Sequence, residues 1–467
     1  MNKKLHVHFA GIGGSALSGI AIMAKDMGFD VSGCDLEDNT AYIEKVKKKK
    51  IKVFLGHNFS HLKGVDVIAV SPAVFFQSDK NQEFKVAEDE GKLVTWDKFV
   101  GDYFLPKKES ICITGTHGKS TTTTMAGLVF ENAKLDPSVI VGATVKQWGT
   151  NYRVGKSDYF IIEADDFYEK FLNYEPSTAI INNIEFDHPD FFKSESDMVK
   201  SYVKFVKLLE KKKNLIINQD SNGNEKLLKK LGKSFLKGIN TISYTFEDES
   251  ELVDKSVKAE IIKSDENGTY FRLVSHALDL NDEYHLSIPG KYKVANATGV
   301  IILSKLYAID QNYVKKSLSA FSGAGRRLDY LGEKNGIKVY DDYAHHPTAI
   351  EVTLQGLRQK YLDNSIWCID EPHSFSRTKA LLKNYKGVFD VADRVIIGPI
   401  FKARDTKTFG VTGESIVKAS KHRNIKYLDD FEKILAFVKN NADEGDIIIV
   451  MGAGLSYKWS RRILEAL

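Results

Sequence analysis

Cysteine and long apolar runs are both scarce in this sequence, and each scarcity excludes a class of protein. The 467 residues include three cysteines, Cys34, Cys112 and Cys368, which lie far apart and form no CxxC pair. This spacing argues against a disulfide framework and a thiolate zinc site, and it favours three buried thiols in a reducing compartment. No apolar stretch approaches the roughly 20 residues that a membrane-spanning helix needs. The first residues, Met1–Lys4, lead into a strand rather than a signal-peptide core. We therefore expect a soluble cytoplasmic protein without stable membrane association.

An excess of charge of one sign is also missing. The 66 basic and 62 acidic residues are interspersed and give a formal net charge of +4, which does not indicate nucleic-acid binding. The four lysines at Lys47–Lys50 read as the solvated end of a helix. A chain of 467 residues is too long for one core and suggests about three domains of roughly 150 residues each.

A glycine-rich turn follows the first predicted strand. Leu5–Ala10 reads as that strand, and Gly11–Gly19 reads as a glycine turn that opens a helix. The next strand, Asp30–Asp35, places the carboxylate of Asp35 roughly 20 positions after the turn, which is the Rossmann arrangement for a pyrophosphate and a ribose. The turn therefore fits a dinucleotide or a nucleotide sugar, or a glycine turn made only for packing.

Another strand, Val65–Val70, completes the pattern of the first domain. It ends at Ser71–Ala73, where a loop at the carboxyl side of a parallel sheet faces ligand. We place the end of the first domain near Pro106–Lys108.

The segment Ile111–Thr124 predicts a phosphate-binding loop. Its glycines allow a tight turn in which backbone N–H groups point at a polyphosphate, and the following helix N-terminus favours negative charge. Lys119 then neutralises the β- and γ-phosphates, and Ser120 offers its hydroxyl to magnesium. The segment lacks the first glycine of the full eight-residue pattern, so an ordinary strand-to-helix turn is the alternative.

Two further predicted strands deliver polar side chains to this loop. Tyr159–Asp165 carries Glu163, and Ala179–His188 ends at His188. Magnesium prefers hard oxygen ligands and keeps several waters, so few protein ligands are needed. We predict that Ser120, Glu163 and His188 hold Mg²⁺. The alternative for His188 is a surface-loop histidine.

The rest of the central domain shows a core strand and a more polar region. Asn214–Asn218 reads as the core strand, whereas Glu247–Asp282 alternates short strands with polar turns and reads as a peripheral sheet. The stretch Ile288–Ala297 begins a helix in which Asn296 can reach an adenine edge.

The last part of the chain predicts a second doubly wound unit. Its predicted strands alternate with helical stretches and are Gly336–Tyr340, Ser365–Ile369, Arg394–Gly398 and Asp446–Met451. The polar clusters Asp341–Pro347 and Asp370–Thr378 follow the first two strands, on the ligand-binding edge. Adjacent histidines such as His345 and His346 do not converge easily on one metal, so we expect nucleotide or substrate contacts there.

The order of these motifs resembles that of the Mur ligase family over essentially the whole chain. The motifs are G-T-H-G-K-S-T-T, E-A-D, N-N-I-E-F-D-H, I-P-G-K-Y-K-V-A-N-A, G-R-R and D-D-Y-A-H-H-P-T. The resemblance implies an α/β fold with three domains. These are an N-terminal Rossmann-like domain for a UDP-sugar (1–106), a central P-loop ATPase-like parallel sheet (107–325), and a C-terminal Rossmann-like domain that closes over ATP and binds an amino acid (326–467).

The resemblance also implies a reaction. The expected activity is ATP- and Mg²⁺-dependent formation of an amide bond between L-alanine and UDP-N-acetylmuramate, through an acyl phosphate, in peptidoglycan biosynthesis. A murein tripeptide as the amine, in cell-wall recycling, is the alternative. An NAD-dependent dehydrogenase and a non-catalytic nucleotide-binding protein are alternatives of other classes. We expect a monomer or a weak homodimer.

Roles for individual residues follow from the resemblance. The implied catalytic residues are Lys119, Glu163, His188 and Arg326. The implied ATP-binding residues are Gly115, Thr116, His117, Gly118, Lys119, Ser120, Thr121, Asn296, Arg326, Arg327 and Asp342. The implied substrate-binding residues are Gly11, Gly13, Gly14, Ser15, Asp35, Ser71, His345, His373 and Arg377, with His57 nearby. The sequence departs from the alanine-adding branch at Asp166–Tyr168 and at Ser374, where that branch has an arginine.

Overall fold

The computed structural model describes residues 4–71, 87–247, 252–265 and 267–467. The chain divides into two compact units, each built from several segments. The first unit holds Met1–Thr114, Lys134–Ala179 and Phe205–Lys213, and the second holds Gly115–Ala133, Ile180–Lys204 and Asn214–Leu467. This division passes through the part of the chain predicted as the central domain, so the domain boundaries near 106 and 325 stay predictions.

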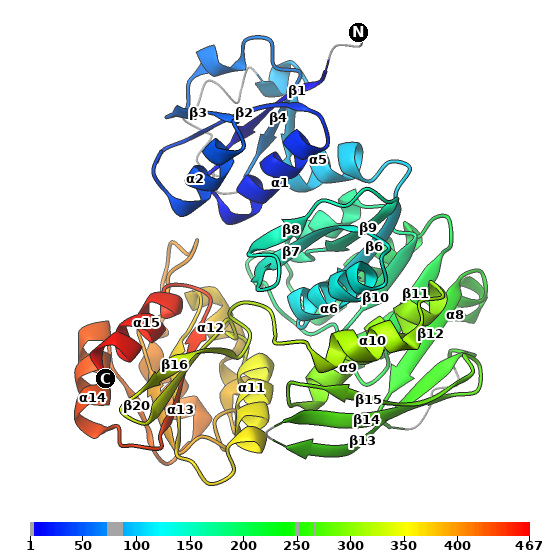
Figure 1. Ribbon diagram of the computed structural model, residues 1–467. Coiled ribbons are helices and arrows are strands. Elements are labelled where there is room, and N and C mark those ends of the chain that lie inside the picture. The colour runs from blue at the N-terminus through cyan, green and yellow to red at the C-terminus, as the bar shows by residue number, and fades with distance from the viewer. Residues whose placement is uncertain (1–3, 72–86, 248–251, 266) are drawn as a thin grey trace. The chain divides into compact units, whose positions relative to one another are not determined.

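The first unit begins with a five-stranded parallel sheet in the order β3-β2-β1-β4-β5 (Figure 1). Its strands are β1 (His6–Ala10), β2 (Asp30–Asp35), β3 (Lys52–Leu55), β4 (Val67–Val70) and β5 (Leu93–Thr95). Helix α1 (Ser15–Asp26) follows β1, and α2 (Ala41–Lys48) follows β2. This order confirms the Rossmann arrangement that the sequence predicts. Of the predicted loop Ser71–Ala73, residues 72 and 73 lie outside the described residues.

Four more strands of the first unit lie in the order β6-β9-β7-β8. They are β6 (Glu109–Thr114), β7 (Ser138–Val145), β8 (Thr150–Arg153) and β9 (Tyr159–Glu163), and the short helices of this unit are η1 (Phe59–Leu62), α5 (Trp96–Phe99), η3 (Val100–Phe104) and η4 (Phe167–Asn173). Strand β9 pairs in parallel with both β6 and β7, whereas β8 runs antiparallel to β7. Strands β6 and β9 occur where the sequence predicts them.

The second unit includes strands in the order β15-β14-β13-β12-β11-β10. These are β10 (Thr178–Ile181), β11 (Asn214–Asn218), β12 (Asn240–Thr245), β13 (Ser256–Asp265), β14 (Gly268–Ser275) and β15 (Leu280–Leu286). The helices of this part are α6 (Lys119–Asn132), α7 (Glu195–Lys207), α8 (Asn222–Lys237), α9 (Lys291–Leu306) and α10 (Gln311–Ser319).

One prediction for this region is wrong in detail. The strand predicted to reach His188 ends at Ile181, because the following residues hydrogen-bond to the phosphate loop instead of continuing a ladder. The strands predicted as a peripheral sheet lie at the edge of the larger sheet, because β13 pairs in parallel with β12. In β14, buried and exposed residues alternate, as expected for a strand with one face covered.

The C-terminal part of the second unit is a six-stranded sheet in the order β16-β17-β21-β18-β19-β20. Its strands are β16 (Asp329–Lys334), β17 (Ile337–Asp342), β18 (Ile366–Glu371), β19 (Arg394–Ile397), β20 (Ile425–Tyr427) and β21 (Ile447–Gly452). Its helices are α11 (Pro347–Lys360), α12 (Phe375–Leu381), η5 (Leu382–Tyr385), α13 (Gly413–Ser420), α14 (Phe431–Asn441) and α15 (Ser456–Ala466). The strands are parallel except β16, which pairs antiparallel with β17 at the edge.

Alternation along the central strand β21 explains why both faces of this sheet carry helices. Ile449 points into a core formed with α11 and α13, whereas Ile448 points into a core formed with α14 and α15 (Figure 1). The predicted second doubly wound unit is therefore confirmed. All three cysteines are buried, as predicted, and none of them forms a disulfide bond. Among the described residues, no helix combines the length and apolar character that crossing a membrane requires.

Candidate functional site

The predicted phosphate loop forms between β6 and α6, and its shape requires glycine at two positions. Gly115 has φ +137° and Gly118 has φ +81°, both in the region that favours glycine. A Cβ atom on Gly118 would lie 2.5 Å from Oδ1 of Asn296, and one on Gly115 would lie 3.0 Å from the backbone N and O of Asn183. The loop is therefore packed against two neighbouring segments so closely that no side chain fits.

Two asparagines that follow β10 hold the loop in place. The backbone N–H of His117 donates to Oδ1 of Asn183 at 2.8 Å, and the N–H of Thr116 donates to the Asn183 carbonyl at 3.0 Å. Asn182 and Asn183 each donate from Nδ2 to the His117 carbonyl at 3.3 Å. These contacts replace the strand ladder beyond Ile181 and fix the backbone of the loop.

The predicted phosphate ligands start helix α6. Lys119 Nζ donates to the Gly115 carbonyl at 2.7 Å, so the lysine folds back across the loop. Ser120 and Thr121 are buried in the first turn of the helix. Asn296, in the second turn of α9, lies against Gly118. The structure thus brings these predicted ATP-binding residues together around one helix N-terminus, which favours an anion.

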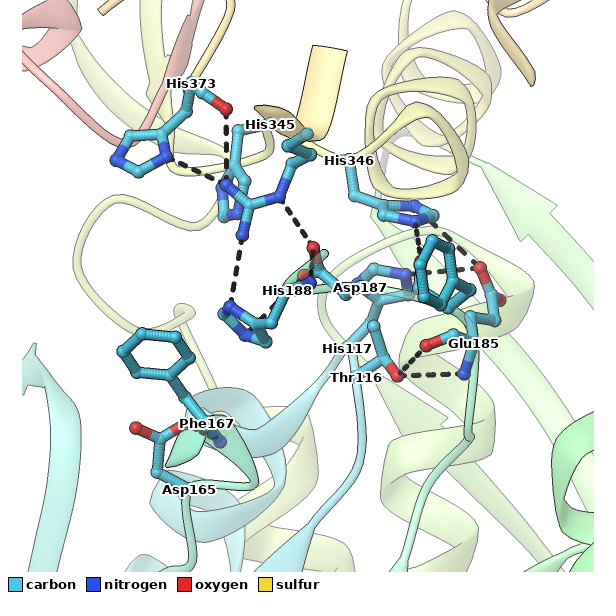
Figure 2. Close-up of polar contacts among 12 residues, drawn as sticks. Thr116, His117, Asp165, Phe167, Glu185, Asp187, His188, His345, His346 and His373 are labelled. Atoms are coloured by element: carbon cyan, nitrogen blue, oxygen red, sulfur yellow. Dashed lines mark hydrogen bonds and ion pairs between the residues drawn. The ribbon is translucent and has the colours of Figure 1, made fainter. Parts of the chain in front are cut away.

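A histidine and carboxylate cluster lies beside the loop. Figure 2 shows His117, Glu185 and His346 turned toward one another. Nε2 of His117 lies 3.4 Å from Oε2 of Glu185, and Nδ1 of His346 lies 3.9 Å from the same oxygen. The two imidazole rings have centroids 4.7 Å apart. Burial alone raises the pKa of Glu185, but hydrogen bonding and charge from His117 outweigh it and lower the pKa to about 2.

Hydrogen bonds fix the tautomer of His346. Its Nδ1 accepts from the backbone N–H of Thr348 and so caps helix α11, which leaves Nε2–H to donate to the Phe186 carbonyl at 3.3 Å. Burial, with the nearby His117, lowers the pKa of His346 to about 4, so the ring is neutral at pH 7. One atom each of His117, Glu185 and His346 lies within 4.8 Å of the others, but a cation would have to displace a hydrogen bond of His346.

The predicted amine-site arginine is buried in an ion pair. Nε of Arg377 donates to Oδ1 of Asp187 at 2.6 Å, and Nη1 lies 2.8 Å from Nδ1 of His373. Nη2 lies 3.5 Å from Nδ1 of His188. Burial raises the pKa of Asp187, but the Arg377 charge outweighs burial and holds the pKa well below its ordinary value. In this structure the guanidinium is thus partnered by the chain's own carboxylate.

Predicted substrate residues surround this ion pair. Nδ1–H of His345 donates to the Tyr343 carbonyl at 2.8 Å, and the His345 ring centroid lies 5.5 Å from that of His373. Figure 2 shows both rings in the upper part of the view, with Asp187 and His188 below them. Ser374, which stands where the alanine-adding branch has an arginine, caps α12, because its Oγ accepts from the Arg377 N–H at 3.2 Å. The sequence does not reveal this role.

The arginines after α10 belong to the edge of the C-terminal sheet. Arg326 Nε donates to Asp341 at 3.0 Å, and its Nη2 donates to the Gly452 carbonyl and to Ser456. Arg327 lies over the ring of Tyr343 at 4.6 Å. Asp342 accepts backbone N–H groups from Leu328 and Ala344, so it ties this segment to the end of β17. Their predicted ATP contacts stay predictions.

Glu163 lies at the end of β9 in the first unit. Its Oε2 accepts from the Gly142 N–H at 2.6 Å. Ser120 and His188 belong to the second unit, so the grouping of these three residues around Mg²⁺ stays a prediction. The altered segment after E-A-D is a turn in which Tyr168 and Glu169 both have φ 54°.

The N-terminal glycine turn forms as expected. The N–H of Gly13 donates to Oδ2 of Asp35 at 2.8 Å, so the carboxylate holds the turn to the end of β2. Gly14 precedes Ser15, the first residue of α1, and no side chain caps this helix. Gly11 has φ +83°, and the Ser71 N–H donates to the Ala10 carbonyl. These residues therefore meet at one sheet edge, with an uncapped helix N-terminus that suits a pyrophosphate.

The sequence gives no specific role to Glu185 and Asp187, and it indicates only nucleotide or substrate contacts for His346. In the structure Glu185 contacts the phosphate loop through His117, and His346 joins the segment after β10 to the start of α11. Asp187 joins the same segment to α12 through Arg377. These residues belong to the motifs N-N-I-E-F-D-H and D-D-Y-A-H-H-P-T. The spacing within the motifs does not show which charged residues pair with one another.

Three family models match the chain. They are the Mur ligase family catalytic domain at residues 6–95, the Mur ligase middle domain at residues 113–304 and the Mur ligase glutamate ligase domain at residues 326–454.

Individual proteins resemble the chain over nearly its full length. A UDP-N-acetylmuramate–L-alanine ligase of Caldicellulosiruptor saccharolyticus is 34% identical over 459 residues and covers 97% of each chain. One of Acetivibrio thermocellus is 33% identical over 99% of this chain and 96% of its own. Among solved structures, the UDP-N-acetylmuramate–alanine ligase of Thermotoga maritima has a TM-score of 0.77 at 22% identity, covering 99% of this chain and 98% of that chain. A murein peptide ligase of Psychrobacter arcticus has a TM-score of 0.67 at 26% identity, with the same coverage. The predicted fold class is confirmed.

The cluster around Glu185 predicts a specific pH dependence of stability. A carboxylate whose pKa falls from 4.5 to about 2 on folding stabilises the folded chain at neutral pH, and this contribution disappears as the pH falls through that interval. Glu185→Gln should therefore lower the free energy of unfolding at pH 7 by about 1.5–3 kcal/mol, as for a hydrogen bond to a charged group. Urea unfolding between pH 7 and pH 3 measures the difference.

The exposed Glu260 of β13 offers a control, since Glu260→Gln should change stability little at either pH. An equal loss for Glu185→Gln at pH 7 and pH 3 would contradict the ionised role of Glu185.

Proposed function

Because this chain belongs to the Mur ligase family, we propose that it is an ATP-dependent ligase that joins L-alanine to UDP-N-acetylmuramate in peptidoglycan biosynthesis. The choice of substrates is supported by relatives at 33–34% identity that carry this activity in their names and cover nearly the whole chain. A cytoplasmic location and a monomeric or weakly dimeric state stay predictions.

One structural observation carries the proposal. Gly115 and Gly118 let the loop pack against Asn183 and Asn296 while Lys119 closes over it at the start of α6. A backbone shaped in this way presents N–H groups and a fixed cation to a polyphosphate. A packing turn needs no lysine folded across it.

The proposed reaction has two steps. A carboxylate oxygen of UDP-N-acetylmuramate attacks the γ-phosphorus of ATP, ADP leaves, and an acyl phosphate forms. The amine nitrogen of L-alanine then attacks the acyl carbon, and phosphate leaves from the tetrahedral intermediate as the nitrogen loses its proton. The chain's part is to position the reactants and to stabilise charge on the transferred phosphoryl group, with Lys119 and Arg326 as the proposed cations.

Magnesium belongs to the proposal as well. The hydroxyl of Ser120 and the carboxylate of Glu163 are hard oxygen donors of the kind that Mg²⁺ prefers, and His188 can orient a bound water. The bound ion would neutralise negative charge on the phosphates of ATP.

The amine site rests on Arg377. Arginine binds a carboxylate through two parallel N–H bonds, a geometry that lysine cannot copy. In the structure Arg377 is held by Asp187 and His373, so an incoming carboxylate must replace one of these contacts. A murein tripeptide remains the second candidate for the amine, favoured by the likeness to a murein peptide ligase at 26% identity.

Phosphate release tests the proposal directly. The purified chain is incubated with UDP-N-acetylmuramate, ATP and Mg²⁺, with L-alanine, other amino acids or a murein tripeptide, and the product is weighed by mass spectrometry. We expect phosphate release that requires L-alanine and a product that has gained one alanine. Phosphate release with the murein tripeptide but not with L-alanine would instead identify a ligase of cell-wall recycling. ATP binding without release under any condition would identify a non-catalytic protein.

Lys119→Ala should abolish most of the activity while leaving the chain folded. The phosphates lose their fixed cation, and we expect kcat to fall by about 100–1,000-fold, as for the loss of one electrostatic catalytic group. Steady-state phosphate release measures kcat, and circular dichroism checks the fold.

The control is Lys134→Ala, which removes an exposed lysine just beyond the other end of α6. Near-normal turnover of folded Lys119→Ala would refute the assignment of the phosphate loop.

Glu163→Gln and His188→Ala should each weaken the response to magnesium. Removing a ligand or an orienting group typically costs about 10–100-fold in metal affinity. Activity is titrated with Mg²⁺ at saturating ATP, and the half-maximal concentration should rise for both variants. Glu260→Gln and His276→Ala, at exposed positions, should match the parent. Titrations of Glu163→Gln and His188→Ala that also match the parent would remove both residues from the metal site.

Arg377→Lys should raise the KM for L-alanine by about tenfold or more, the cost of one hydrogen bond to a charged group. The KM for ATP should change much less. Arg423→Lys, at an exposed position, is the matched control. Equal effects of Arg377→Lys on both substrates would place amine recognition elsewhere.

A further inference from the structure

A second cluster of metal-ligating side chains lies in the N-terminal sheet of the first unit. His8 is on β1, Cys34 is on β2 and His61 is in η1. One potential ligand atom of each lies within 4.8 Å of the other two. None of these residues has a role in the proposed reaction.

Two nitrogens of this cluster are buried without a partner. Nε2 of His8 and Nδ1 of His61 are both inaccessible to solvent and have no hydrogen-bond partner among the described residues. His8 is fully buried. A buried polar atom left without a partner costs free energy, and most are satisfied in folded proteins. Two such atoms on neighbouring rings indicate a missing partner that both can bind.

The surrounding contacts orient the possible ligands. Nδ1 of His8 lies 2.9 Å from Oγ of Ser32, which leaves Nε2 as the nitrogen directed elsewhere. The ring of His61 stacks on Phe54 with centroids 4.2 Å apart. Sγ of Cys34 lies 3.1 Å from Nδ1 of His57. The contact of His8 Nδ1 with Ser32 is of the kind by which metal-binding histidines usually engage their second ring nitrogen, which fixes the ring and its tautomer.

We propose that His8, Cys34 and His61 form a binding site for a divalent metal ion of the nitrogen- and sulfur-binding class, for which Zn²⁺ is the probe. Two imidazoles and one thiolate suit Zn²⁺ and do not suit Mg²⁺. The scarcity of cysteine pairs argues against a site built on several thiolates. A site with two histidines and one cysteine from three separate segments has no short sequence motif, so the sequence alone does not show it.

Binding needs one deprotonation. Zn²⁺ takes the place of the thiol proton of Cys34, so a Zn–S bond forms as one proton is released, with the His57 imidazole placed to accept it. The bound ion would join β1, β2 and η1 and stabilise this part of the sheet.

Metal binding by the full-length chain tests the proposal. The protein is treated with a chelator, dialysed, and titrated with Zn²⁺ by calorimetry and with Co²⁺ by absorption spectroscopy. We expect a tight binding event of one Zn²⁺ per chain and, with Co²⁺, a near-ultraviolet band from thiolate coordination. Cys34→Ser should abolish the band, and His61→Ala should weaken Zn²⁺ binding by at least about 100-fold.

Matched variants separate this site from other possibilities. Cys368→Ala removes a buried cysteine elsewhere, and His276→Ala removes an exposed histidine, so both should bind like the parent. Ser32→Ala keeps all three ligands and should weaken binding by about 10–100-fold through loss of orientation. Because His8 is fully buried, His61→Ala and Cys34→Ser carry the test, and melting temperatures without metal confirm that they fold.

Some results would overturn the proposal. One is the absence of a thiolate band with Co²⁺. Another is Zn²⁺ binding that Cys34→Ser and His61→Ala leave unchanged. Binding that Glu185→Gln removes while Cys34→Ser retains it would assign the ion to His117, Glu185 and His346 instead.

Discussion

The close approach of backbone at Gly118 is the constraint on which the site depends. The loop passes where a Cβ would meet Asn296 at 2.5 Å and Asn182 at 2.9 Å. Because these amides come from α9 and from the segment after β10, the position of the loop is set by two elements distant in sequence. Strand β10 therefore ends at Ile181, because the residues that follow it turn their side-chain amides toward His117 in the loop.

A buried ion pair provides the second fixed point of the site. Arg377 and Asp187 are 6% and 4% exposed, so their charges are almost entirely withdrawn from water. Such a pair adds little net stability, but removal of one partner leaves a buried charge that costs about 3–5 kcal/mol. Two histidines near the pair, His373 and His345, are held neutral, since burial lowers the pKa of His373 to about 4 and that of His345 well below its ordinary value.

Much of the fold could be predicted from the sequence, because it follows from local pattern. Apolar runs such as Ile447–Met451 and glycine turns such as Gly11–Gly14 determine strands and strand-to-helix turns with little help from distant residues. The edge strand β16 was missed, since its half-exposed residues lack a clear alternation. Partners within the site were also missed. Glu185 could equally be a solvated loop residue, and only the fold brings it to His117 and His346. Likewise, the sequence shows at Ser374 only the absence of an arginine, whereas the fold makes this residue a helix cap.

The cap on α12 determines where this helix begins and therefore the direction in which the Arg377 side chain points. Ser374 fixes the first residue of the helix, and Arg377 follows three residues later with its own N–H bound to the cap. Each residue of an α-helix turns the side-chain direction by about 100°. An insertion or deletion of one residue between these two positions would therefore swing the guanidinium away from Asp187, although the composition of the segment would hardly change. A change in the length of this segment would thus dismantle the ion pair, whereas substitutions that keep Ser374 and Arg377 leave it in place.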